Sequence, residues 1–184
     1  MIGSLIKSEF HWILYRAESL PPAEIAEMSI EVVGPGERLS KAQFQFLRRE
    51  WSRCMICYLL RLRCWGKGWV FLAKQAGQFV HYTFACSGRH YRRELPPIKE
   101  RHALLVGPCG THPQFRGRSI YSRVLRYAVN WLSEKGHGPF YINVSPYNVA
   151  SIRGIEKAGF IRLGVWAGKK RAANLWTSSV RVGD

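Results

Sequence analysis

The spacing of apolar side chains changes along this chain of 184 residues, and each spacing predicts a different element. Helical spacing is clearest in residues 41–64, where the apolar positions are Phe44, Leu47, Trp51, Cys54 and Tyr58. Ser40 precedes this run and is suited to cap the helix N-terminus. The pattern therefore predicts a long helix with a basic outer side.

Runs typical of strands occupy residues 10–17, 69–75 and 79–86, and a glycine-containing turn joins the last two into a predicted hairpin. Two adjacent prolines open residues 21–28, which predicts the first turn of a short helix there. A turn is expected at residues 34–37, where glycine and proline alternate.

A further apolar run at residues 102–111 is interrupted by Gly107, Pro108 and Gly110. Proline cannot donate to a sheet ladder and glycine weakens a strand, so this strand is predicted to bulge or separate from a neighbour near residue 108. Separation would open a slot beside unpaired backbone groups. The polar, basic segment 87–101 before it is expected to be an exposed loop that faces a substrate.

The second half of the chain alternates between helical spacing and strand spacing of its apolar residues. The predicted elements are a helix from Ile120 that ends at Gly136–Gly138, a strand at 139–144, a helix at 149–158 closed by Gly159, and strands at 160–166 and 174–182 around a basic loop. In the first helix, Ile120, Val124, Ala128, Trp131 and Leu132 share one face. Behind an antiparallel hairpin, this order predicts an α/β (α+β) fold with a mixed sheet.

Composition limits the organisation and the partners. The length and the 47% hydrophobic content are enough for one substantial core, so residues 1–184 are interpreted as a single domain. The 28 basic and 12 acidic residues give a formal charge of +16, which favours anionic partners such as nucleic acid, membrane surfaces, phosphorylated cofactors or acidic carrier proteins. Charge alone does not choose among them.

The cysteines and the N-terminus indicate the compartment. Five cysteines, an odd number, occur without a recognisable signal peptide or an apolar stretch long enough to cross a bilayer, so a reducing cytoplasm is expected. Cys54, Cys57 and Cys64 have no second pair at zinc-binding spacing, and they are interpreted as buried residues rather than a metal site.

Residues 112–119, HPQFRGRS, place Arg116 and Arg118 immediately before a helix. A helix N-terminus carries unpaired N–H groups and partial positive charge, so arginines are unfavourable there unless an anion engages all of these groups. The segment predicts a phosphate site; an ordinary basic loop is the alternative.

The segment GPCGTHPQFRGRS, followed about thirty residues later by NVASIRGIEKAGF, resembles the two signature segments of the GCN5-related N-acetyltransferase (GNAT) family. The resemblance covers roughly residues 69–166. It implies a mostly antiparallel central sheet that is splayed at an acyl-CoA site, helices on both faces, and acetyl-CoA as cofactor.

The resemblance also implies roles for individual residues. The loop that would wrap the pyrophosphate consists of Gln114, Phe115, Arg116, Gly117, Arg118 and Ser119, with the amides of 116 to 120, including Ile120, directed at phosphate oxygens. Cys109 and Thr111 would pair with the pantetheine arm, and the Cys109 amide would polarise the thioester carbonyl, while its thiol is interpreted as a small buried group. Asn148 and Ser151 would contact the cofactor. Ser119 departs from the usual glycine or alanine, and a small hydroxyl is expected to fit.

Acid–base residues follow the family pattern less closely. Ile155 stands where many members have a tyrosine that protonates the departing thiolate, which leaves Tyr147, Tyr121 or a water as donors. Leu105 stands where some relatives have a carboxylate. The candidate bases are His81, Glu94, His90, Glu100 and His102. Structural alternatives remain open: a hydrogen-bonded strand histidine at 81, solvated carboxylates at 94 and 100, and a core or turn aromatic at 147.

The favoured function is transfer of acetyl to a primary amine by direct attack in a ternary complex. GPC-T-P-x-x-RG-x-x-IY is also similar to acyltransferases that accompany bacterial polysaccharide assembly, which implies an amino sugar on a nucleotide or lipid carrier as a small acceptor whose phosphates make it anionic. The alternatives are a long-chain acyltransferase supplied by acyl carrier protein, and a non-catalytic nucleic-acid-binding module. Nucleic acid is disfavoured because the basic residues form no stripe with interleaved aromatics. Oligomeric state is open, and a homodimer is one option.

Overall fold

The computed structural model describes residues 9–50, 68–87, 98, 100, 102–170 and 176–179. Its strands form one eight-stranded sheet in the order β2-β3-β4-β5-β6-β1-β7-β8. The strands are β1 (Glu9–Ala17), β2 (Ser29–Val33), β3 (Gly68–Gln75), β4 (Gln78–Ser87), β5 (Leu104–Thr111), β6 (Phe140–Val144), β7 (Ile161–Lys170) and β8 (Trp176–Ser179). All neighbouring strands are antiparallel except β5 and β6.

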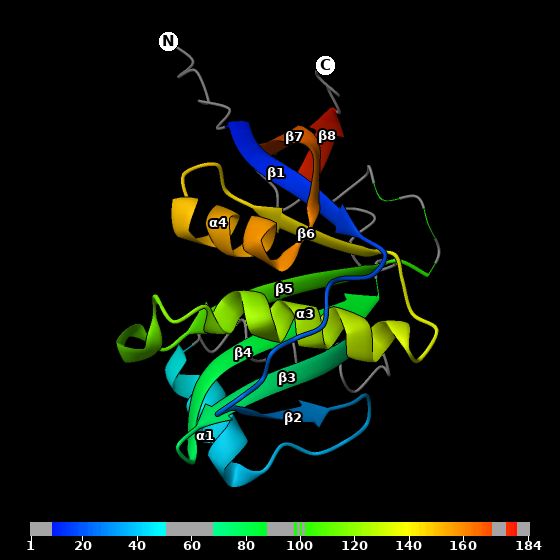
Figure 1. Cartoon of the computed structure of the whole chain (residues 1–184). Helices are drawn as coiled ribbons and strands as arrows, with labels where there is room; N and C mark the ends of the chain where they lie inside the picture. The colour runs from blue at the N-terminus through cyan, green and yellow to red at the C-terminus, as the bar shows by residue number, and fades with distance from the viewer. Residues whose placement is uncertain are drawn as a thin grey trace.

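Helices cover both faces of the sheet, which confirms the prediction (Figure 1). The described helices are α1 (Lys41–Glu50), α3 (Ile120–Ser133), α4 (Val149–Ala158) and the short 3-10 turn η2 (Pro113–Phe115). Alternate residues of β3 show the two sides: Phe71 belongs to the core cluster that contains α3 and α4, and Leu72 to the cluster that contains α1. No helix among these described elements is long and apolar enough to cross a membrane.

The sheet divides between β5 and β6. These parallel strands pair only at Leu104–Phe140 and Leu105–Tyr141, and Figure 1 shows them separating toward the end where β5 leads into α3. On its other side β5 follows β4 with a register shift between Thr83 and Ala85. The predicted distortion of residues 102–111 is therefore confirmed, and it leaves the β6-facing edge of β5 without a described partner strand beyond residue 105.

The strand β1 lies between β6 and β7, although it comes first in the chain (Figure 1). Ile13 pairs with Val144 on one side and with Val165 on the other. The second half of the sheet consequently depends on the N-terminal strand. The apolar pattern predicts this strand but not its place.

Two predicted elements are corrected. Residues 21–28 form no helix; instead Asn130 of α3 holds this segment, because its side chain accepts from the Leu20 amide at 3.2 Å and donates to the Pro21 carbonyl at 3.3 Å. Strand β7 continues to Lys170, into the predicted basic loop, because Ala167–Lys170 pair with β8. Residues 51–64 of the predicted long helix, with Cys54, Cys57 and Cys64, lie outside the described residues.

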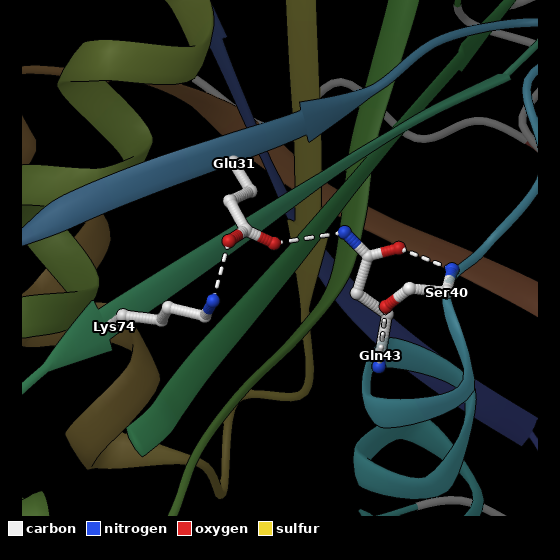
Figure 2. A network of polar contacts seen from close by, with 4 residues as sticks. All are labelled: Glu31, Ser40, Gln43 and Lys74. Carbon is white, nitrogen blue, oxygen red and sulfur yellow. Dashed lines mark hydrogen bonds and ion pairs between the residues drawn. The ribbon is translucent and has the colours of Figure 1, made fainter. Parts of the chain in front are cut away.

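A polar network fixes α1 to the edge of the sheet (Figure 2). Ser40 and Gln43 form a reciprocal cap: the Ser40 amide donates to Gln43 Oε1 at 2.8 Å, and the Gln43 amide donates to Ser40 Oγ at 3.2 Å. Gln43 Nε2 then donates to Glu31 Oε2 at 2.8 Å, and Lys74 Nζ donates to the other Glu31 oxygen. The predicted cap at Ser40 is confirmed, and the same glutamine joins the helix to β2 and β3.

We predict that Glu31→Gln lowers stability at neutral pH and not in acid. The Lys74 hydrogen bond, opposed in part by burial and assisted by Gln43, lowers the pKa of Glu31 below its ordinary value of 4.5. A carboxyl group whose pKa is lower in the folded state than in the unfolded state stabilises the fold at any pH above its unfolded-state pKa. This stabilisation disappears as the pH falls through its folded-state pKa. Solvent screening limits the difference to about 0.2–1 kcal/mol.

Urea unfolding of the wild type and of Glu31→Gln between pH 3 and 7 measures the difference in their free energies of unfolding. The matched control is Glu134→Gln, because Glu134 is exposed and forms no ion pair with a described residue. A deficit in Glu31→Gln of equal size at every pH would contradict the assignment.

Candidate functional site

The N-terminus of α3 has no cap of its own. Ser119 occupies the cap position in a left-handed conformation (φ 57°), its side chain does not cap the helix, and no acidic residue lies in the first turn. Gly117 is also left-handed, with φ 78°. The first main-chain bond into this end is from the Arg123 amide to the Ser119 carbonyl at 3.2 Å. Within the described part of the chain, the amides of 117 to 119 have no main-chain acceptor, which suits them to an anion.

The Arg116 amide differs from this expectation. It donates to the Pro113 carbonyl at 3.2 Å and closes the η2 turn, so it is not directed outward with the amides that follow. Gln114 in this turn is exposed, and Phe115 packs partly against the core. Ile120 is buried at the start of α3 and ties the loop to the core.

Three basic side chains surround the uncapped end. Arg116 Nε donates to the Thr111 carbonyl at 3.1 Å, and the Arg118 guanidinium lies 5.2 Å from the centre of the Phe115 ring. Lys157 of α4 donates to Ser119 Oγ at 2.7 Å. None of the three cations forms an ion pair with a described residue. Sequence reasoning missed Lys157, although it lies inside the second signature segment, because its proximity to Ser119 depends on the packing of α4 against α3.

Cys109 lies on the distorted strand opposite Thr83 of β4. Burial raises the pKa of its thiol to about 12, against smaller opposing effects of hydrogen bonds with Thr83, Tyr121 and the Phe84 backbone. The thiol is therefore protonated at neutral pH and is no nucleophile. The thiol therefore fits the interpretation of a small buried group, and the role of the Cys109 amide stays a prediction.

His81 is fully buried, and neighbouring threonines hold both of its ring nitrogens. Nδ1 lies 2.7 Å from Thr111 Oγ1, and Nε2 lies 2.9 Å from Thr83 Oγ1. Burial lowers the pKa of His81 to about 3, so the ring is neutral. The geometry fits a hydrogen-bonded strand histidine, which was the structural alternative for His81. Because neither ring nitrogen is exposed, His81 does not suit a role as general base for a substrate amine.

Tyr121 of α3 connects the distorted strand to α4. Its hydroxyl lies 3.3 Å from Ser151 Oγ and hydrogen-bonds the Cys109 thiol. Burial and then the Cys109 charge raise its pKa well above 10. Gly154 makes this possible, since a Cβ on that residue would collide with the Tyr121 ring. The phenol consequently joins two residues that were predicted to contact the cofactor.

Asn148 begins α4 and caps it, because its Oδ1 accepts from the Ser151 amide at 3.1 Å. Tyr147, in the turn before it, is 91% exposed and is therefore no core aromatic. Ile155, at the family's tyrosine position, is buried in the core.

The remaining candidate bases do not meet at the slot. Glu100 accepts from the Tyr141 hydroxyl at 2.7 Å and lies 3.9 Å from Arg16. His102 is exposed just before β5 begins, at the end where β5 and β6 are paired. Glu94 and His90 lie outside the described residues. The described residues contain no group of three side chains suited to hold a metal ion.

The sequence model of the Acetyltransferase (GNAT) family matches residues 38–160, which is more than half of the chain. This chain belongs to the GNAT acetyltransferase family, as the two signature segments predicted. Acetyltransferases of this family use acetyl-CoA. No curated protein matches the chain.

Solved structures with the same fold share little sequence with it. A GNAT acetyltransferase from Colwellia psychrerythraea has 14% identity and a TM-score of 0.59, over 84% of this chain and 54% of that one. The aminoglycoside acetyltransferase AAC(6')-Iy with a bisubstrate analogue has 14% identity and a TM-score of 0.56, over 83% and 99%. An aminoglycoside acetyltransferase from an uncultured soil metagenomic sample, in complex with trehalose, has 12% identity and a TM-score of 0.51, over 74% and 90%.

This chain aligns with only 54% of the Colwellia psychrerythraea protein, and with 66% of another GNAT-family acetyltransferase, from Novosphingobium aromaticivorans. At these identities the likeness shows the fold alone.

We predict that Gly117→Glu abolishes binding of CoA, because it puts a carboxylate among the amides at the α3 N-terminus. Isothermal titration calorimetry should show a Kd for CoA that is raised by about a hundredfold or more. Gly36→Glu is the matched control. Both glycines are left-handed (φ 78° and 79°) with open space at Cβ, so each substitution carries a similar backbone cost of about 1–2 kcal/mol. Equal CoA affinity in the two variants would refute the site.

Proposed function

We propose that this protein transfers the acetyl group of acetyl-CoA to a primary amine of a small anionic acceptor, with an amino sugar on a phosphorylated carrier as the leading candidate. One observation carries the proposal. The uncapped N-terminus of α3, which has no acidic residue in its first turn and is surrounded by Arg116, Arg118 and Lys157, directly follows a strand that has separated from its neighbour.

The residues present fit the cofactor. A diphosphate suits the amides of 117 to 120 and the three cations, because backbone N–H groups and the helix dipole favour an anion at the same point. The edge of β5 that faces away from β4, at Cys109 and at Thr111, whose carbonyl accepts from Arg116, has no described strand beside it and suits an amide-containing arm such as pantetheine. Asn148 and Ser151, at the start of α4, complete the proposed cofactor contacts.

Acetyl-CoA supplies an activated thioester, and the protein orients it. The Cys109 amide is proposed to donate to the carbonyl oxygen as negative charge develops there, a contribution of about 3–4 kcal/mol in well-studied sites. The acceptor nitrogen bonds to the acetyl carbon and the carbon–sulfur bond breaks, so CoA leaves as a thiolate. Direct attack in a ternary complex is favoured because the one thiol described at the slot, that of Cys109, is protonated.

Tyr121 is the proposed proton donor to that thiolate. The Tyr121 hydroxyl lies beside Ser151 and Cys109, and it is protonated at neutral pH, although its burial raises its pKa and makes it a weaker acid. Tyr147 remains the second candidate because its exposed turn also borders α4. A thiolate is a good leaving group, so the donor is not expected to be essential.

The base that deprotonates the amine is not His81, for the reasons given above. Glu94, which lies outside the described residues, stays a prediction, and a water can perform the same step. The excess of basic residues favours an anionic acceptor.

The aminoglycoside acetyltransferases among the similar structures suggest a second class of acceptor. Aminoglycosides are polycations, and a chain with a formal charge of +16 opposes them. They therefore rank below phosphorylated amino sugars. The positive charge of this chain is also the only support for acyl carrier protein as the acyl donor, because it would attract an acidic protein.

A thiol-release assay with acetyl-CoA across a panel of amines tests the function. The panel contains amino sugars with and without phosphate, aminoglycosides and polyamines, and a second series replaces acetyl-CoA with longer acyl-CoAs and acyl carrier protein. Thermal stabilisation by CoA is expected. Stabilisation by an oligonucleotide in a salt-dependent manner, with none by CoA, would instead favour a nucleic-acid-binding module.

We predict that Tyr121→Phe lowers kcat by about tenfold to a hundredfold and leaves the Kd for CoA within about threefold, because a general acid acts on the departing group rather than on binding. Tyr147→Phe is the matched comparison and should leave kcat unchanged. The reverse ranking would assign the proton to Tyr147. Melting temperatures of both variants show whether loss of the buried hydrogen bonds, about 1 kcal/mol, affects the fold.

A further inference from the structure

A second basic surface lies beside the phosphate loop, next to α1. A groove of about 890 Å³ opens between α1, the turn that joins β3 to β4, and the η2 turn. This volume is in the range of pockets that hold small ligands. None of the residues discussed so far for acetyl transfer lines it except Gln114 and Phe115.

Two uncompensated cations line this groove. Arg48 and Arg49 of α1 are both exposed, and neither forms an ion pair with a described residue. Lys74 also lines it, but Glu31 neutralises its charge. No acidic side chain occurs among the described lining residues, so the groove has a net positive charge.

The other lining groups suit a ring attached to an anion. Phe79 of β4 and Phe115 of η2 are half-buried and present aromatic surface, and the exposed amides of Gln78 and Gln114 can donate and accept hydrogen bonds. Aromatic surface binds a sugar or a planar base, and arginine binds phosphate oxygens in a bidentate manner.

The groove is formed before any ligand arrives. Gln43 and Lys74 converge on Glu31 and hold the N-terminal part of α1 against β2 and β3 (Figure 2). Phe46 of α1 stacks on Phe79 with ring centres 5.5 Å apart, which fixes the floor of the groove. The two arginines thus project from an anchored helix, so less conformational entropy is lost when they bind a ligand.

We infer that this groove binds a phosphomonoester carried on a sugar or nucleoside, next to the diphosphate held by the α3 N-terminus. The inference rests on the proposed function, because Gln114 and Phe115 are shared by the groove and the phosphate loop. Two ligands of that reaction carry such a group: CoA, through its ribose 3′-phosphate, and a phosphorylated amino sugar. The chemistry recognised is the same for both.

The test uses the double variant Arg48→Gln/Arg49→Gln. Its matched control, Arg38→Gln/Lys41→Gln, removes the same two charges from exposed residues that do not line the groove. Kd values for CoA and for dephospho-CoA, which lacks only the 3′-phosphate, are measured by calorimetry for the wild type and both variants. If CoA supplies the phosphate, the wild type prefers CoA, and the groove variant loses that preference by about tenfold or more while the control keeps it.

The second arm measures acceptor binding by the same three proteins after each has been saturated with dephospho-CoA. Glucosamine 6-phosphate and glucosamine are titrated into each protein, with inorganic phosphate as a probe of the anion alone. If the acceptor supplies the phosphate, the wild type prefers glucosamine 6-phosphate, the groove variant loses this preference, and the CoA to dephospho-CoA ratio is the same in all three proteins. The preference should also weaken as ionic strength rises.

The inference is overturned if the groove variant matches the control in both arms. The proposed function fails separately, and earlier, if the wild type binds neither CoA nor dephospho-CoA. If the wild type binds both CoA and dephospho-CoA, and the Arg48→Gln/Arg49→Gln variant binds as the control does, the proposed acetyl transfer stands and only the inference about the groove is rejected.

Discussion

The parallel pairing of β5 with β6 over two residues is the constraint on which the rest of the site depends. Backbone N–H and C=O groups inside a sheet are normally paired, and here those on the β6-facing side of β5 have no described strand beside them beyond residue 105. A ligand with its own amides can satisfy such an edge. The same separation directs the chain from β5 into the loop before α3, so unpaired strand and uncapped helix follow each other within a few residues.

The polar groups of the site fall into two sets, exposed cations at the helix end and neutral groups behind the strand. The exposed cations Arg116, Arg118 and Lys157 gather at the helix end, where only an anion relieves their mutual repulsion. The buried polar groups behind the strand, His81 and Cys109, are neutral because burial shifts each pKa away from ionisation. The interior of the site is therefore a fixed set of hydrogen bonds, and its charge lies at the mouth.

Sequence patterns predicted the elements better than their contacts. The interrupted run at residues 102–111 indicated the separated strand because Pro108 removes a donor, and the arginines before Ile120 indicated an anion because charge at a helix end is a local property. Lys157, the burial of His81 and the place of β1 depend on packing between distant segments, and no local spacing encodes these. The helix expected at 21–28 fails for the same reason, since Asn130, distant in the sequence, bonds to the Leu20 amide just before this segment and to the Pro21 carbonyl at its start. Predictions for residues 51–64 and for Glu94 stay predictions.

The place of β1 has a consequence for biosynthesis. This strand emerges from the ribosome early, but both strands that flank it, β6 and β7, belong to the last third of the chain. Until they are made, its apolar side chains and open hydrogen-bonding edges have nothing to cover them. Closure of that half of the sheet is therefore a late, long-range event, and an incomplete chain that lacks β6 and β7 exposes the kind of strand edge that favours aggregation.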